Sequence, residues 1–308
     1  MLVVFYSKFT TEPSILQTWW HYILSKTLLC GRPHWGAYGE RKKMNGPIVL
    51  NIALCLYGNA FQQNEIIPDF FNNSTAQFCK KIEFSLIRKS LLGKTEKKII
   101  YENPNNFFDK LGALYTQFNL YYESINKNDG LEERMSAGFI GGGGKWNLVS
   151  TNEKDTSVWT AFWDVIDQNN PNKKIWGVNY IKTGNQYLCN EDDDNYINNF
   201  YSALEEIYNF TIKKNDSAFA NCCKNAVTTL NSNGKELFGY HKDLVPNCYK
   251  KIEYLLDACQ SAWVFGGMGS WNDIWIEDEN ILNEYKIVSN NLYSSLISTI
   301  IQSVNSVI

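Results

Sequence analysis

Histidine is scarce in this sequence: the 308 residues include only His21, His34 and His241. Three widely spaced histidines do not supply the closely spaced ligands typical of a zinc site, and none of the eight cysteines forms a C-x-x-C pair. The sequence therefore predicts no metal site and no bound cofactor. It identifies no catalytic residue either, which leaves open whether the protein is an enzyme.

The sequence also has no excess of basic residues: it contains 29 Lys and Arg and 32 Asp and Glu, which gives a net charge of −3. Proteins that bind nucleic acid gather Lys and Arg against phosphates, and the longest basic run here is Arg41-Lys42-Lys43. No apolar run reaches the roughly 18 residues that cross a membrane. We therefore expect neither nucleic acid nor membrane as a partner, and a cytoplasmic protein whose cysteines stay reduced.

The sequence is rich in aromatic residues and contains one motif twice. Residues 261–273 read SAWVFGGMGSWND, and residues 136–147 read SAGFIGGGGKWN. Aligned without gaps, the two segments share Ser, Ala, three Gly, Trp and Asn. We call them the first and second Gly/Trp segments in chain order. The repeat predicts an internal duplication of a helical unit, and the alternative is two unrelated glycine-rich loops.

Apolar spacing favours helices in most of the chain. Apolar side chains three and four residues apart predict helices over residues 74–92, over 106–125, from Asp155 onward, over 192–208 and from Asp278 onward. The apolar run 47–57 fits either a buried strand or a short buried helix, and residues 97–101 and 174–182 resemble strands. The predicted fold class is therefore mainly α, an α+β fold with a minor β element.

The same patterns divide the chain into three parts. Residues 1–45 differ from the rest and are expected to form an N-terminal extension or arm, which leaves open whether residues 1–43 belong to the folded protein. Residues 46–190 form a first helical or α+β unit, and residues 191–308 form a C-terminal helical unit.

The Gly/Trp segments are the candidate functional sites. Neither has the G-x-x-x-x-G-K-[ST] or G-x-G-x-x-G spacing, which argues against a phosphate-binding loop. In one interpretation each glycine run ends a helix and the tryptophan packs back onto it. In the other, the segments bind a polar ligand such as a sugar. The candidate ligand-binding residues are Trp146, Asn147, Trp271, Asn272 and Asp273.

Two classes of function follow from these observations. The first is a non-enzymatic cytoplasmic binding protein, whose partner is an unknown protein or a small polar ligand. The second is a hydrolase acting on a sugar-like substrate, with the Gly/Trp segments lining its cleft. The hydrolase requires Trp271 and Asp273 to be partly exposed in a concave site with a second carboxylate roughly 5–10 Å away.

Overall fold

A computed structural model describes residues 44, 46–89, 95–112, 114–115, 117–125, 132–187, 193–266 and 269–307. These residues belong to one compact unit within residues 42–308. Apart from Met44, the predicted N-terminal extension, residues 1–45, lies outside the described residues.

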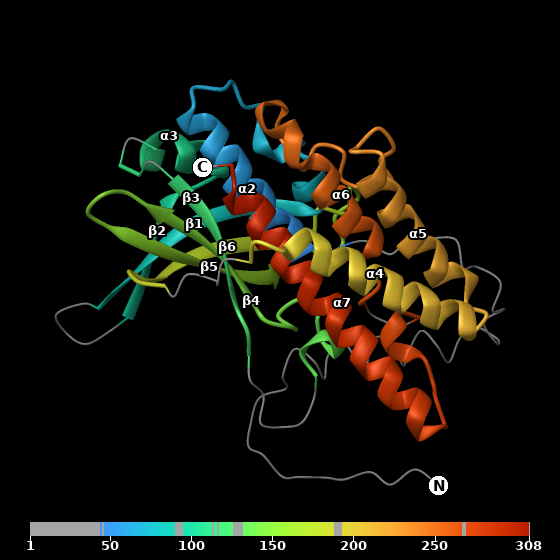
Figure 1. Ribbon diagram of the computed structural model, residues 1–308. Coiled ribbons are helices and arrows are strands. Elements are labelled where there is room, and N and C mark those ends of the chain that lie inside the picture. Colours follow the sequence, from blue (N-terminus) through green and yellow to red (C-terminus); the bar gives the residue numbers. More distant parts are fainter. Residues whose placement is uncertain are drawn as a thin grey trace, which may run out of the picture. The chain divides into compact units, whose positions relative to one another are not determined.

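A six-stranded mixed sheet is a major part of this unit (Figure 1). Its strands are β1 (Cys79–Lys89), β2 (Thr95–Tyr101), β3 (Gln117–Glu123), β4 (Lys145–Thr151), β5 (Thr156–Val165) and β6 (Trp176–Gly184). They lie in the order β2-β1-β6-β5-β4-β3, and the β1–β6 pair is parallel while the other neighbours are antiparallel. The predicted mainly α fold with a minor β element is therefore wrong, since the fold mixes α and β with a large sheet.

Three of the predicted helices account for this error. Residues 79–89 of the helix predicted over 74–92 form strand β1, and the helix predicted from Asp155 is strand β5. The helix predicted over 106–125 is divided into α3 (Pro104–Gly112) and strand β3. Apolar residues four positions apart lie on one face of a helix and also on one face of a strand, so the spacing did not separate the two.

Six helices form the rest of the described unit. Besides α3 they are α2 (Gly46–Gln62), α4 (Tyr196–Lys213), α5 (Ser217–Asn231), α6 (Glu253–Ala262) and α7 (Glu279–Asn305). Helix α2 packs against strands β3 and β4 and against α7, so it lies between the sheet and the helical layer (Figure 1). The residues from Ile48 to Ala60 are all buried. A helix that is apolar all round has no amphipathic pattern, which explains why residues 47–57 fitted a strand equally well.

The C-terminal helices and two of the strands confirm the sequence patterns. Helix α4 covers most of the predicted range 192–208, and α7 begins after Asp278, whose carboxylate accepts hydrogen bonds from the amides of Asn280 and Ile281 at 2.9 and 3.0 Å. The predicted strands 97–101 and 174–182 correspond to β2 and β6.

The predicted internal duplication is wrong. The 125-residue offset between the Gly/Trp segments places strand β1 on helix α4. The first segment follows a 3₁₀ turn, η3 (Glu133–Met135), and enters strand β4. The second follows helix α6 and enters a different 3₁₀ turn, η5 (Trp271–Asp273). Short glycine-rich segments can share residues without sharing structure, because glycine permits many backbone conformations.

Candidate functional site

The two Gly/Trp segments touch each other, although they are not structural repeats. A Cβ atom added to Gly138 would lie 2.2 Å from the carbonyl carbon of Gly266 and 2.3 Å from its Cα. Only a residue without a side chain at position 138 permits this approach of two backbones. Gly138 and Gly266 therefore form part of a junction between the sheet and the helical layer.

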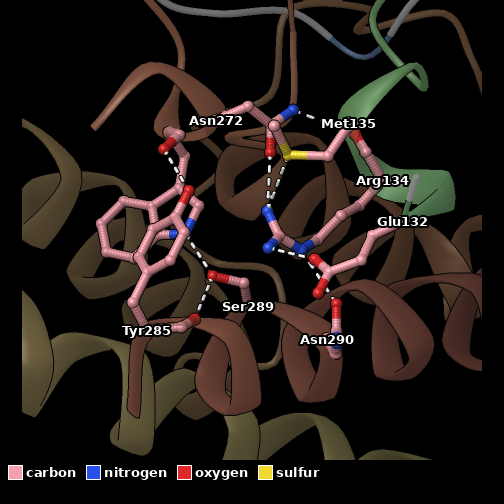
Figure 2. Close-up of polar contacts among 8 residues, drawn as sticks. Glu132, Arg134, Met135, Asn272, Tyr285, Ser289 and Asn290 are labelled. Atoms are coloured by element: carbon pink, nitrogen blue, oxygen red, sulfur yellow. Dashed lines mark hydrogen bonds and ion pairs between the residues drawn. The ribbon is translucent and has the colours of Figure 1, made fainter. Parts of the chain in front are cut away.

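Arg134, two residues before the first segment, fastens this junction (Figure 2). Its side chain is 2% exposed and forms an ion pair with Glu132. Its Nη1 donates to Oδ1 of Asn272 at 3.0 Å and to the sulfur of Met135 at 3.3 Å, and its Nε donates to Oδ1 of Asn290 at 2.8 Å. The Nδ2 of Asn272 in turn donates to the carbonyl oxygen of Arg134 at 2.9 Å. A buried guanidinium needs such partners, and here they come from η3, η5 and α7.

Trp271 lies in the same cluster and is fully buried. Its Nε1 donates to Oγ of Ser289 at 2.7 Å, and the hydroxyl of Tyr285 donates to the Trp271 carbonyl at 2.6 Å (Figure 2). The two rings stack with centroids 5.4 Å apart, and the guanidinium carbon of Arg134 lies 5.2 Å from the Tyr285 ring centroid. Trp271 therefore serves as a core residue of this junction, and its ring is not available as an open stacking platform.

The other predicted site residues of the second segment also have partners within the fold. Asn272 is half-buried and pairs with Arg134. Asp273 is exposed, and its carboxylate accepts hydrogen bonds from the amides of Gly269 and Ser270. Ser270 caps the turn from the other side, which completes a capping box around η5.

The predicted residues of the first segment lie in strand β4. Trp146 is buried, with its ring centroid 4.7 Å from that of Tyr122, and Asn147 is buried and accepts a hydrogen bond from Oγ1 of Thr160 at 2.7 Å. Neighbouring residues of a strand point to opposite faces of the sheet. Trp146 and Asn147 therefore face opposite sides of the sheet.

A cleft of about 500 Å³ lies beside the Arg134 cluster, between strand β3, turn η3 and helix α7. We call it the η3–α7 cleft. It is lined by Tyr122, Ser124, Glu132, Glu133, Arg134, Asn290, Tyr293, Ser294, Ile297, Ser298, Ile301 and Gln302. None of the predicted site residues is among them. The one sequence signal for this site is its position, since residues 132–134 lie two to four residues before the first Gly/Trp segment.

Glu133 forms the polar end of the cleft. Its Oε2 accepts hydrogen bonds from Oγ of Ser124 at 2.6 Å and from the amide of Ile125 at 3.2 Å. Its Oε1 lies 3.5 Å from the hydroxyl of Tyr293, which is 3.2 Å from the hydroxyl of Tyr122. Burial raises the pKa of the Glu133 carboxyl, against the opposing effect of these hydrogen bonds. The same burial raises the pKa of the Tyr293 hydroxyl, and the nearby Glu133 raises it further.

A second polar cluster lies away from the cleft and joins Ser74, His241 and Asp243. The Ser74 hydroxyl donates to Asp243, and the Ser74 amide donates to the same carboxylate at 2.7 Å. Because the single hydroxyl proton is used there, Nδ1 of His241, 2.7 Å from the Ser74 oxygen, is the donor of that contact. In a catalytic triad the histidine lies between the serine and the carboxylate and takes the serine proton. Here the serine lies between them, so the cluster ties the turn at Ser74 to the loop before α6.

Neither the described residues nor comparisons with known proteins indicate further chemistry. In the described part of the chain, no three His, Cys, Asp or Glu side chains are grouped so as to hold a metal ion. No helix among the described residues is both long and apolar enough to cross a membrane. Compared with known proteins, the chain matches no family model, no curated protein and no solved structure.

Proposed function

We propose that the protein is a non-enzymatic binding protein that holds a small polar ligand in the η3–α7 cleft. The observation that carries this proposal is the cleft itself. Its volume of about 500 Å³ is in the range of small-molecule sites, roughly 300–1,000 Å³. Such sites combine apolar walls with a few polar groups, and here Ile297 and Ile301 lie beside the hydroxyls of Tyr293, Ser294 and Ser298.

The cleft is built on rigid elements, which supports a preformed binding site. One wall is the middle of the 27-residue helix α7. The other wall is held by the buried Arg134 and by Glu133, each of which has several hydrogen-bond partners. A preformed site loses little conformational freedom when its ligand binds.

The alternative of a sugar hydrolase is less well supported. It requires an exposed Trp271, but Trp271 is fully buried. In the η3–α7 cleft Glu132 forms an ion pair with Arg134, which leaves Glu133 as the one carboxylate of the described lining without a cationic partner. A binding role needs no free pair of carboxylates, whereas hydrolysis of a glycoside does.

A thermal-shift screen tests the proposal. We expect at least one member of a panel of neutral sugars, polyols and small amines to raise the melting temperature of the wild-type protein, because a ligand of the folded state stabilises it. Ser294→Trp fills the cleft from its exposed rim and should abolish the rise. Ser202→Trp, a matched change at an exposed serine of α4, should preserve it. A rise that survives Ser294→Trp, or a panel without any effect, would contradict the proposal.

We also propose that the protein works in the cytoplasm. The six described cysteines, Cys55, Cys79, Cys222, Cys223, Cys248 and Cys259, are all free thiols. Cysteines remain free thiols in a reducing compartment, whereas disulfides form and persist in an oxidising one, so these thiols support a cytoplasmic location. Fractionation of the native cell, followed by thiol labelling of the purified protein, tests this location.

A further inference from the structure

We propose that the η3–α7 cleft selects a cationic ligand, an alkylamine or polyamine whose ammonium group is held by the Glu133 carboxylate. This inference rests on the proposed function, because it names the ligand class of the same site.

The charge of Glu133 is not balanced by a cation of the described unit. The hydrogen bonds that Glu133 accepts come from neutral groups, namely the hydroxyls of Ser124 and Tyr293 and the amides of Ile125 and Gly144. No lysine or arginine among the described residues forms an ion pair with it. A half-buried carboxylate with only neutral partners attracts a cation more strongly than an exposed one does.

The net charge of the cleft remains negative when its other charged residues are included. Arg134 is the one cation of the described lining, and its ion pair with Glu132 cancels one charge of each sign. Asp193 adds a further carboxylate near the rim, where it accepts a hydrogen bond from Ser298 at 3.2 Å. An anionic ligand such as a phosphate would meet this field with repulsion, so the charge balance favours an ammonium group.

The neutral part of the lining suits the rest of such a ligand. The hydroxyls of Tyr122 and Tyr293 lie beside the carboxylate, and a hydroxyl oxygen can accept a hydrogen bond from an ammonium group. Ile297 and Ile301 offer apolar contacts to a methylene chain, while the exposed Ser294 offers a hydroxyl acceptor for a further N–H group. A diamine or polyamine carries these features in one molecule, since it alternates ammonium groups with short apolar spacers.

Calorimetric titration with putrescine and with 1,4-butanediol tests the inference on the full chain. The two probes have the same carbon chain and differ in charge. We expect putrescine to bind and the diol to bind at least about tenfold more weakly, which corresponds to 1.4 kcal/mol. Added salt should weaken putrescine binding, because it screens the attraction between charges. Glu133→Gln should reduce putrescine affinity at least about tenfold, whereas Glu153→Gln, at an exposed position outside the cleft, should leave it unchanged.

The possible results separate the two proposals. If the diol or a neutral sugar binds as tightly as putrescine and Ser294→Trp abolishes that binding, the cleft is a ligand site but its preference for cations is wrong. If no probe binds, or if Ser294→Trp leaves the binding of every probe unchanged, both proposals fail. If Glu133→Gln does not fold, the salt dependence decides: putrescine binding that is insensitive to salt overturns the inference.

Discussion

The side-chain amide of Asn305 pairs with both main-chain groups of Leu120. Its Nδ2 donates to the Leu120 carbonyl at 3.0 Å and its Oδ1 accepts from the Leu120 amide at 2.8 Å. Asn59 of helix α2 does the same for Phe118, with both distances 2.7 Å. Strand β3 is an edge strand, and these two asparagines occupy positions where a further strand would pair.

Asn305→Leu should therefore destabilise the protein and expose the edge of the sheet. Each buried main-chain group left without a partner costs about 1–3 kcal/mol. We expect a lower free energy of unfolding in chemical denaturation and a greater tendency to associate, measured by light scattering. Asn291→Leu, on the exposed side of the same helix, removes a surface contact to Glu206 and should change stability by less than about 0.5 kcal/mol. Equal effects of the two changes would contradict the role given to Asn305.

Arg134→Met should cost about 3–5 kcal/mol, because it leaves the partners of a buried charge unpaired. Arg134→Lys should recover only part of the loss, since an ammonium group cannot reproduce the fork of donors to Asn272 and Asn290. The measurement is chemical denaturation of each variant. Lys145→Met is the control, because Lys145 and Glu123 form an exposed ion pair at 3.5 Å, which should contribute about 0–1 kcal/mol.

Two tryptophans four residues apart should respond very differently to truncation. Trp271 is fully buried, and Trp271→Ala should cost about 3–5 kcal/mol. Trp275 is 85% exposed, and Trp275→Ala should change stability by less than about 0.5 kcal/mol. Thermal unfolding of both variants tests this difference. If Trp271→Ala unfolds like the wild type, Trp271 does not stabilise the core.

Glu133 should make stability fall as the pH rises from about 4.5 through the raised folded-state pKa of this carboxyl. Its folded-state pKa is raised above the ordinary value of 4.5, so above pH 4.5 the unfolded chain loses this proton first and is favoured. The loss levels off above the raised pKa. Glutamine does not titrate, so the melting temperature of the wild type should fall relative to that of Glu133→Gln as the pH rises through this range. If the melting temperature of the wild type rises relative to that of the variant, the folded state lowers the pKa of this carboxyl.

The sequence predicted the C-terminal helices well but not the sheet, and strand β5 shows the physical reason. Val158 and Phe162 are four residues apart, and so are Trp159 and Trp163. Each pair lies on one face of a helix and equally on one face of a strand. In β5 the two pairs lie on opposite faces, with Trp159 buried and Phe162 48% exposed. The choice between helix and strand depends on neighbouring strands that are distant in the sequence.

The candidate site was less accessible to sequence reasoning than the fold. The Gly/Trp segments do mark a junction, and Asn272 is one of its polar residues. The partner of Asn272, however, is Arg134, which is outside the repeated motif and has no special local pattern. The cleft beside it combines residues of β3, η3 and α7, so only the folded chain brings them together.

The parallel pairing of β1 with β6 has a consequence for synthesis on the ribosome. Cys79 pairs with Trp176, and at 5–20 residues per second roughly 5–20 s separate their translation. Helix α2, which precedes β1, is complete even earlier, while the β3 and β4 strands that cover its apolar surface are still to be made. The apolar surface of α2 thus waits several seconds during synthesis for the two strands that cover it in the folded protein.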